Sequence, residues 1–467
     1  MLNLFNTLTR QVDAFKSLEL ERVSLYTCGP TVYNYAHVGN LRTYVFEDIL
    51  KRALIINEYD VNHVMNITDV GHLVSDADEG EDKMELGAAR EGRTAWDIAQ
   101  FYTDQFRVDL ANLNVIEPNI WCKATDHIQE QIEWIQRLEA LGYTYILEDG
   151  VYFDSAKFGE YGRLARLDIE GLQAGVRVEM VVGKRQSTDF ALWKFSPSDR
   201  QRQMEWQSPW GIGFPGWHIE CSVMAVKYLG EHIDIHCGGV DHVAVHHTNE
   251  IAQTESVTGE QWVNWWMHGE FLVLKTAVSN DPQKMAKSGD NFITLNLLIE
   301  KRYDPLAYRY FLLNAHYRAK LTFTWEALDG ATTAFNRLKK RVLNLKSAAA
   351  DGVPNQSYLE SFSTAVNNDL NMPRALAVVW EMLKDVTLPP AKKYATLLLM
   401  DRVLGLGIAD WQPEITEIPP AVVALVEERA VARENRDFAE SDRIRDELKL
   451  MGYGVEDTPD GVQIKPI

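Results

Sequence analysis

The chain has 467 residues, which is enough for two to four domains and a substantial buried core. Its formal net charge of −20 argues against a general electrostatic attraction to nucleic acid, although it does not exclude a local basic surface. No stretch approaches the ~20 consecutive apolar residues of a membrane-spanning helix, and the first residues lack the pattern of a secretory signal. Four cysteines in so long a chain do not make a disulfide framework, so we expect a cytoplasmic location without membrane association.

The first strongly patterned part of the chain is residues 23–50. A strand-like run ends near Cys28, the chain turns at Gly29, and apolar residues follow at helical spacing from about His37. A strand, a turn and a helix N-terminus in this order can bind nucleotide phosphates, because the first helical N–H groups lack partners and the helix dipole favours anions. The motif is weak on its own, since a histidine in this position can equally be a helix cap or a packed core residue.

Strands and helices alternate from there to about residue 290. We expect a strand at 61–67, a charged exposed loop over 75–93, helices at about 94–114 and 124–142, a helix opening at 216–221, a strand at 233–236, a helix from His246 and a last strand at about 265–274. Short alternating strands with glycines over 150–205 are typical of an insertion that splits a sheet. The pattern predicts an α/β fold with a Rossmann-like nucleotide-binding domain.

The remainder of the chain is predicted to be mainly helical. A compact helical region over 291–320 precedes an all-α bundle with helices at about 325–346, 357–369, 372–385 and 391–404. Beyond a linker at 413–420 we expect helices at 421–433 and 436–451, and then a hairpin that pairs 453–455 with 462–464. These last elements form a small C-terminal α/β module.

Positive charge gathers between Lys301 and Lys346 in this otherwise acidic chain. Ten basic residues there stand against three acidic ones, Asp304, Glu326 and Asp329, which leaves a net charge of +7. Two interpretations stay open: the segment is a solvated helix face, or it is a patch that follows the phosphate backbone of a nucleic acid.

Four side chains far apart in the sequence are candidate metal ligands: Cys28, Cys221, His246 and Glu250. His246 and Glu250 are four residues apart and therefore share one face of a helix. Thiolate, imidazole and carboxylate all bind zinc. Spacing alone leaves a second interpretation open, because buried cysteines often act as small hydrophobes and such a His–Glu pair also occurs on surfaces.

Two short stretches resemble the paired signatures of class I aminoacyl-tRNA synthetases. His37-Val-Gly-Asn40 resembles the HIGH signature, and Lys284-Met-Ala-Lys287-Ser288 resembles the KMSKS signature. A loop with two lysines suits a second contact with a triphosphate.

Longer motifs are similar to those of the cysteinyl-tRNA synthetase family, and this resemblance runs nearly end to end. They are Cys28-Gly-Pro-Thr-Val-Tyr33, Phe214-Pro-Gly-Trp-His-Ile-Glu-Cys-Ser222, Gly238-Gly-Val-Asp241, His246-His-Thr-Asn-Glu250, Asn371-Met-Pro-Arg-Ala-Leu376 and Ala439-Glu-Ser-Asp-Arg-Ile-Arg-Asp-Glu-Leu448. The resemblance implies an enzyme that activates L-cysteine with ATP and passes it to tRNA(Cys), with Mg²⁺ accompanying the ATP.

The resemblance also implies roles for the matching residues. One zinc per chain would be held by Cys28, Cys221, His246 and Glu250, and would select a thiolate over the hydroxyl of serine. The catalytic residues would be His37, Asn40 and Lys287, and the ATP site would also include Gly29, Thr31, Gly39 and Lys284. The amino-acid pocket would be lined by Cys28, Thr68, Trp217 and Asp241, of which the last three can equally be structural.

The chain departs from the family pattern in three places. Ala286 stands where the lysine signature usually has serine, and residues 280–283 lengthen the approach to it. The family's more frequent Phe-Pro-His-His-Glu-Asn-Glu is Ala-Val-His-His-Thr-Asn-Glu over 244–250. These changes spare the expected zinc ligands and Lys287, and bring the turnover rate and the mobility of the loop into question.

The resemblance and the pattern together predict six segments in a monomeric protein. They are the two halves of the catalytic domain at 1–149 and 206–290, a connective insertion at 150–205, a stem-contact region at 291–324, a helical tRNA-binding bundle at 325–412 and an anticodon module at 413–467. Two other functions are alternatives: a cysteine ligase of the mycothiol-pathway type, which would not need an anticodon-reading C-terminus, and a non-catalytic RNA-binding paralogue, which predicts damaged site residues.

Overall fold

The computed structural model describes residues 1–71, 82–167, 183–199, 201–276, 279–284, 292–347, 352–413, 419–458 and 461–466. The chain divides into two compact units, Met1–Trp411 and Gln412–Ile467. Among the helices of these described ranges, none combines the length and the apolar character needed to span a bilayer.

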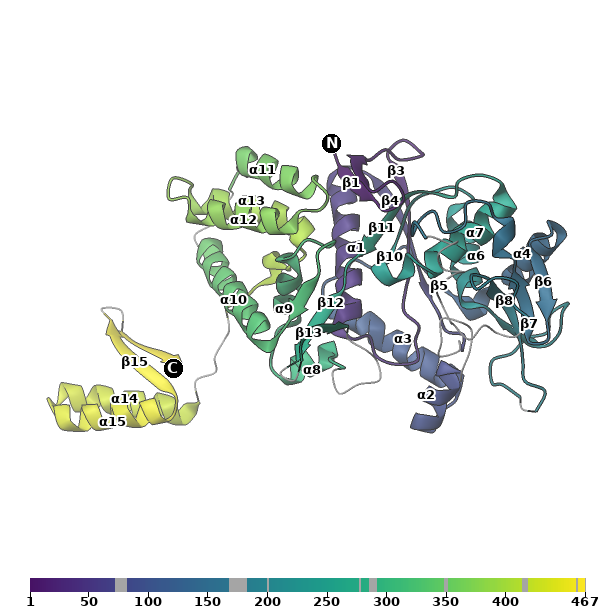
Figure 1. Cartoon of the computed structure of the whole chain (residues 1–467). Coiled ribbons are helices and arrows are strands. Elements are labelled where there is room, and N and C mark those ends of the chain that lie inside the picture. The colour runs from purple at the N-terminus through teal and green to yellow at the C-terminus, as the bar shows by residue number, and fades with distance from the viewer. Residues whose placement is uncertain are drawn as a thin grey trace. The chain divides into compact units, whose positions relative to one another are not determined.

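A five-stranded parallel sheet forms the centre of the first unit (Figure 1). Its spatial order is β11 (Val263–Gly269), β10 (Ile233–Gly239), β3 (Arg22–Thr27), β4 (Asp60–Ile67) and β5 (Ile120–Lys123). The strand order reverses between β3 and β10, so the sheet has a topological switch point there, where ligands bind in open α/β sheets. The predicted Rossmann-like α/β fold is confirmed.

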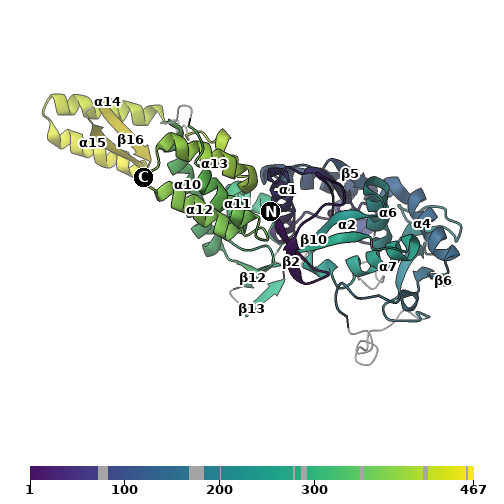
Figure 2. The ribbon, with the colours of Figure 1, turned by 90° about the horizontal axis from the view of Figure 1, so that it is seen from above.

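Helices cover both faces of this sheet, so most residues of β3, β4, β10 and β11 are buried whichever face they point to. Helix α1 (Val38–Ile56) packs on one face with Leu25 and Ile235, whereas α6 (Trp217–Leu229) and α7 (His246–Thr258) pack on the other face with Tyr26 and Val64. Figures 1 and 2 show α1 on one side of β10 and the α6–α7 pair on the other. Helices α3 (Ala95–Asn112) and α4 (Ile128–Ala140) flank β5 in the chain.

A second, antiparallel sheet interrupts the central one. It contains β6 (Thr144–Leu147), β7 (Gly150–Phe153), β8 (Phe190–Phe195) and β9 (Gly213–Pro215), in that order. The sheet therefore begins before and ends after the range 150–205 that the glycine-rich pattern indicated. The strand expected near residue 176 lies outside the described residues.

Two sequence expectations for the first unit are wrong in detail. A short helix, α2 (Lys83–Glu91), lies in the charged segment that was expected to be a loop, and Asp82 caps it by accepting from two main-chain N–H groups. The single strand expected at 265–274 is two strands in two sheets. β11 ends at Gly269, and β12 (Leu272–Thr276) pairs instead with β13 (Ser279–Lys284) and β14 (Leu321–Phe323).

The rest of the first unit is helical, as predicted. It contains α8 (Leu295–Glu300), α9 (Pro305–Leu313), α10 (Trp325–Ser347), α11 (Gln356–Val366), α12 (Met372–Lys384) and α13 (Pro390–Leu404). A hairpin of β1 (Asn3–Asn6) and β2 (Gln11–Ala14) precedes the central sheet in the chain.

The basic segment 301–346 is less uniform than its composition suggests. Arg309 is fully buried, donates to the carbonyl oxygens of Leu113 and Leu404, and forms an ion pair with Asp48 of α1. It is therefore part of the core and cannot belong to a surface patch. Exposed basic residues of the segment are Lys301, Arg302, Arg318, Lys320, Arg337, Lys340 and Arg341, of which Arg318 pairs with Asp369.

The second unit consists of α14 (Pro420–Glu434), α15 (Phe438–Leu450) and the hairpin of β15 (Tyr453–Thr458) and β16 (Gly461–Pro466). The predicted hairpin is present, but its register differs: residues 453–455 pair with 464–466 instead of 462–464. The small core of the second unit contains Val422, Val426, Ile444 and Leu448.

Candidate functional site

A cavity of about 270 Å³ opens at the carboxyl ends of β3 and β10, beside the switch point of the sheet. The adjoining strands are held together here, because the Cys28 N–H donates to the carbonyl oxygen of Cys237. The cavity lining includes Cys28, Gly29, Thr31, Asn40, Thr68, Trp217, Cys221, Asp241 and His246, among others. Nine residues that the sequence singled out thus surround one space.

The N-terminus of α1 forms one edge of this cavity. His37 is the N-cap: its Nδ1 accepts from the Asn40 N–H at 2.9 Å, and the Asn40 Oδ1 accepts from the His37 N–H at 3.3 Å. A side chain on Gly39 would place its Cβ 3.0 Å from the His37 ring, so only glycine fits without a shift. The interpretation of His37 as a helix cap is therefore confirmed. The same residue also lines a smaller cavity next to the first one.

Two of the first helical N–H groups already have partners. The Val38 N–H donates to the Ile293 carbonyl oxygen at 2.8 Å, and the Asn40 N–H donates to His37. An anion at this end would consequently rely on the side chains of His37 and Asn40 more than on bare main-chain N–H groups.

Gly29 lies at the turn after β3, where the main chain passes very close to β4. A Cβ on Gly29 would lie 1.6 Å from the Asn66 carbonyl oxygen, which no side chain can occupy. The Gly29 N–H donates to the Asn66 Oδ1 at 2.8 Å, and the Asn66 Nδ2 donates to the Thr68 Oγ1 at 3.1 Å. The Thr68 hydroxyl in turn donates to Glu220, which is fully buried. Thr68 is thus fixed by its neighbours as it faces the cavity.

The four side chains predicted as metal ligands converge at the base of the cavity. Cys28, Cys221, His246 and Glu250 are all buried, and one potential ligand atom from each lies within 4.8 Å of the others. The His246 Nε2 is 3.0 Å from the Glu250 Oε1, as their spacing on α7 requires. A thiolate pair, an imidazole and a carboxylate in this arrangement form a donor set that suits zinc.

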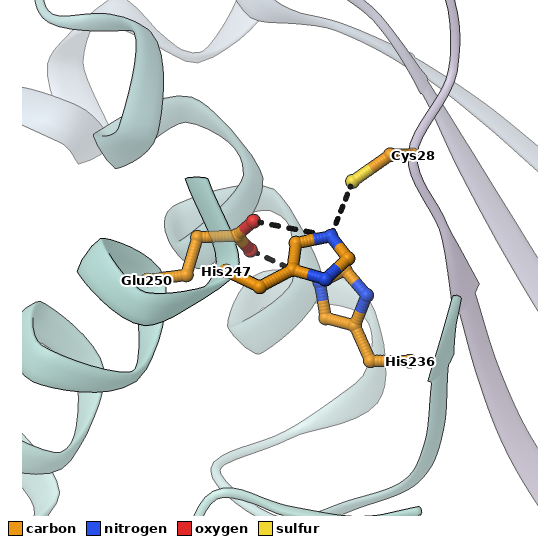
Figure 3. A group of neighbouring side chains, drawn as sticks. All are labelled: Cys28, His236, His247 and Glu250. Carbon is orange, nitrogen blue, oxygen red and sulfur yellow. Dashed lines mark hydrogen bonds and ion pairs between the residues drawn. The ribbon is translucent and has the colours of Figure 1, made fainter. Parts of the chain in front are cut away.

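A second donor set overlaps the first, and the sequence interpretation missed it. It shares Cys28 and Glu250, and adds His236 from β10 and His247 from α7 (Figure 3). The His247 Nε2 lies 3.3 Å from the Cys28 Sγ, and the His236 Nε2 lies 3.0 Å from the Glu250 Oε2. The i, i+3 spacing of His247 and Glu250 is a signal that could have indicated their contact.

Access separates the two sets. Cys28, Cys221 and His246 line the cavity, whereas His236 and His247 are not among its lining residues. A metal bound by the first set can therefore meet a small molecule in the cavity. His236 and His247 lie deeper, and His247 is braced from behind by His268, whose Nε2 is 2.8 Å from the His247 Nδ1.

Burial and neighbouring charges give the two thiols different acidities. Burial raises the pKa of the Cys28 thiol well above its usual value, and Cys221 and Glu250 add to the shift. Cys221 accepts from the Cys28 thiol, and this interaction lowers the pKa of Cys221 in spite of burial. Cys221 is thus the more acidic of the two thiols in the metal-free protein.

The His246 imidazole and the Glu250 carboxylate also shift each other's pKa. Burial by itself would raise the pKa of Glu250, but His236 and His246 outweigh it and lower that pKa to about 2. Burial would likewise lower the pKa of His246, but Glu250 and Cys221 outweigh it and raise that pKa to about 10. The protonated His246 therefore supplies positive charge to a buried, anionic cluster. A metal cation would take the place of that proton, because a ligating imidazole must be neutral.

Trp217 and Asp241 complete the wall next to the first donor set. The Trp217 ring lies 4.3 Å from the His246 ring, centroid to centroid, and is tilted by 35°. The Asp241 carboxylate lies against Gly239, since a Cβ on that glycine would lie 2.4 Å from the Asp241 Oδ1. Both residues line the cavity as well as packing locally.

The lysine signature is only partly within the described residues. Lys284 ends β13, but its side chain and the whole of Lys287 lie outside them. The structure therefore gives no position for either amino group.

Comparison with known proteins agrees with the geometry. The family model described as the class I (C) tRNA synthetase catalytic domain matches residues 14–333, and the cysteinyl-tRNA ligase anticodon binding domain matches 416–464. Curated relatives are cysteine–tRNA ligase 1 of Burkholderia lata, 55% identical over 99% of this chain and 96% of the relative, and cysteine–tRNA ligase of Treponema denticola, 44% identical over 98% of each.

Solved structures show the same fold at low sequence identity. A leucyl-tRNA synthetase of Agrobacterium radiobacter matches with a TM-score of 0.60 and 10% identity, over 82% of this chain and 83% of that one. A methionyl-tRNA synthetase of Mycobacterium tuberculosis matches with a TM-score of 0.56 and 15% identity, over 82% and 90%.

The fold and its cavity define a class I aminoacyl-tRNA synthetase. Within that class, the chain belongs to the cysteine–tRNA ligase family.

Proposed function

We propose that this enzyme activates L-cysteine with ATP, forming cysteinyl-adenylate and pyrophosphate, and transfers the cysteine to the 3′ end of tRNA(Cys). The observation that carries the proposal is the convergence of two cysteines, a histidine and a glutamate on the cavity that also meets the N-terminus of α1. Amino acid and nucleotide can therefore bind side by side.

The first donor set is the proposed zinc site. When bound there, zinc prefers a thiolate to a hydroxyl and so distinguishes cysteine from serine, which a shape-based pocket separates only about 10–200-fold. Cys28, Cys221, His246 and Glu250 would hold the ion, while His218 orients His246, since their Nδ1 atoms lie 2.9 Å apart. Thr68, Trp217 and Asp241 would position the rest of the amino acid.

Activation needs no general base, because the substrate carboxylate is already a nucleophile. Catalysis then rests on placement and on stabilising the charge that develops at the α-phosphorus. His37 and Asn40 would contact the phosphates, and Lys287 would stabilise the charge that develops in the transition state. Lys284 and Thr31 would belong to the ATP site, where Gly29 and Gly39 would let the nucleotide approach the main chain. Mg²⁺ would accompany ATP.

The segments after the catalytic domain are proposed to hold the tRNA. The basic residues that remain exposed between 301 and 346 would follow the backbone, in the stem-contact region 291–324 and the bundle 325–412. The module 413–467 would read the anticodon, in line with the matching domain model. The segment 150–205 is proposed as the connective insertion, and the protein as a cytoplasmic monomer.

Cysteine-dependent ATP–pyrophosphate exchange, followed by charging of tRNA(Cys), tests this proposal. We expect exchange with L-cysteine, none above background with L-serine, and attachment of cysteine to the tRNA. Exchange without any charging would instead indicate a cysteine ligase with another acceptor. No exchange at all would contradict the proposed activity.

A further inference from the structure

Arg42 is a buried arginine of α1, and within the described part of the chain its hydrogen-bond acceptors all belong to the main chain of other segments. It is 5% exposed. Its Nη1 donates to the carbonyl oxygens of Glu270, at 2.9 Å, and Phe271. Its Nη2 donates to the carbonyl oxygens of His316, at 3.2 Å, and Ala319. One guanidinium thus ties two separate segments to the helix that carries His37.

The first of these segments, 269–272, is the place where β11 ends and the chain changes sheet. Its four residues line one wall of the smaller cavity, whose other wall contains His37, Gly39 and Asn40. The segment lies directly on α1, because a Cβ on Gly269 would be 3.2 Å from the Phe46 ring. Any shift of 269–272 relative to α1 would change the width of this cavity.

The second segment supports the first from the opposite side. The Glu270 N–H donates to the Tyr317 carbonyl oxygen at 2.8 Å, and the Leu321 N–H donates to the Phe271 carbonyl oxygen at 3.2 Å. Arg42 binds carbonyl groups on both segments, so it closes a three-way junction between α1, 269–272 and 316–321.

We propose that Arg42 is a positioning residue for ATP: it sets the separation between the N-terminus of α1 and segment 269–272, and hence the fit of the nucleotide between them. This inference rests on the proposed function, since it takes the cavity beside His37 as the nucleotide end of the site. Arg42 itself is not among the residues that line that cavity, so it acts through the main chain of Glu270 and Phe271.

The planar fork of arginine is what this junction requires. Its donors point in fixed directions toward acceptors on two segments, whereas a lysine ammonium concentrates three donors at one point. A neutral replacement would remove the one donor group that the carbonyl groups of Glu270, Phe271, His316 and Ala319 share, and would leave Phe271 and His316 only the main-chain N–H groups of Leu321 and Ala319. The segment would relax, and a displacement of ~1 Å in a reacting geometry can cost ~10²-fold in rate.

A matched control exists elsewhere in the same unit. Arg309 is also buried, and it also donates to main-chain carbonyl groups, at 2.7 Å to Leu404 and 2.9 Å to Leu113. It lines neither cavity at the site. Arg309 also pairs with Asp48 of α1, so replacing it by lysine should disturb the core beside that helix while leaving every Arg42 contact to 269–272 and 316–321 in place.

The test is steady-state ATP–pyrophosphate exchange by the full chain, with ATP and cysteine varied separately, for wild type, Arg42→Lys and Arg309→Lys. We expect Arg42→Lys to raise the KM for ATP about tenfold or more and to leave the KM for cysteine within about twofold. Arg309→Lys should lower the melting temperature but leave both KM values near those of wild type.

A second variant reaches the same wall without removing a charge. Gly269→Ala presses against Phe46 and should push the segment away from α1, so it should also raise the KM for ATP selectively. Each variant that is obtained as folded, soluble protein decides the question. The proposal is overturned if such a variant keeps a wild-type KM for ATP, or if its KM values for ATP and cysteine rise by the same factor. A wild-type protein that shows no cysteine-dependent exchange would instead contradict the proposed function.

Discussion

At the scale of single residues, Asp109 illustrates how burial alone changes the pKa of a carboxyl group. It lies on α3, is 4% exposed, and burial raises its pKa to about 7. A carboxyl group with a raised native pKa binds its proton more tightly in the folded state than in the unfolded chain. Its contribution to the free energy of unfolding is therefore full below pH 4 and is lost as the pH rises toward 7.

Asp109→Asn should remove this pH dependence, because the amide stays neutral. We expect the stability gain of the variant over wild type to be larger at pH 8 than at pH 5, by an amount on the order of 2 kcal/mol. Urea unfolding at the two pH values measures the difference. Asp104→Asn, on an exposed position of the same helix, should show no such gain, and equal gains at both pH values for Asp109→Asn would show that its charge is not the cause.

The proposed metal ligands lead to a second residue-scale prediction. Purified protein should contain close to one zinc per chain, and Cys221→Ser or His246→Ala should lose most of it, because each removes one of four ligands that the fold brings together. Metal analysis after gel filtration provides the measurement. His232→Ala, at an exposed histidine, is the control. Full zinc content in both ligand variants would exclude the assigned set.

The sequence could indicate some of this site but not its assembly. The i, i+4 spacing placed His246 beside Glu250, and the cap signal at His37 was visible in the motif. The spacing could not indicate that Cys28 and Cys221 lie close together, because they are far apart in the chain. Cys28 follows β3, Cys221 lies on α6 just before β10, and these two strands are neighbours in the sheet. That pairing came from family resemblance. His236 was missed because a histidine within an apolar strand has no local pattern that distinguishes a ligand from a packed residue.

At the scale of elements, the lysine signature at 284–288 is the predicted feature that the structure tests least, because 285–288 lie outside the described residues. Lys287 lies outside the described residues, so its role remains a prediction from the signature. Lys287→Ala should slow cysteine activation by ~10²–10³, the usual effect of losing one transition-state donor, while cysteine affinity barely changes. Single-turnover activation and equilibrium cysteine binding separate the two effects. An unchanged rate would mean that this loop is not the second phosphate contact.

Long, strongly periodic elements were predictable, and their ends were not. The helices after residue 325 lie within a few residues of their predicted positions, because their apolar residues repeat at helical spacing. The break between β11 and β12 was not predictable, because residues 263–276 remain strand-like throughout while the chain changes sheets at 270–271. Arg42 donates to the carbonyl groups of Glu270 and Phe271 at that break. Tertiary contacts here override local propensity.

At the scale of the whole molecule, chemistry and tRNA recognition are assigned to different parts of the chain. Every described candidate ligand and pocket residue belongs to the unit Met1–Trp411, which has its own core. The unit Gln412–Ile467 has a separate small core and matches an anticodon binding domain.

A chain truncated after Pro413 should therefore activate cysteine at close to the full rate. Its aminoacylation should fall, mainly through a raised KM for tRNA, and changes in the anticodon should no longer affect it. Steady-state charging of tRNA(Cys) with natural and altered anticodons measures both effects. Charging by the truncated protein that equals the intact enzyme would show that the terminal unit does not read the tRNA.

A metal held by Cys28, Cys221, His246 and Glu250 is proposed to bind the thiol of the substrate. Cobalt(II) can report this directly, because thiolate ligands give it characteristic charge-transfer absorption whose intensity grows with their number. In the cobalt-substituted enzyme we expect this absorption to increase when L-cysteine is added, as a third thiolate joins the two from the protein, and to stay unchanged with L-serine. An absorption that does not respond to cysteine, or responds equally to serine, would contradict the account.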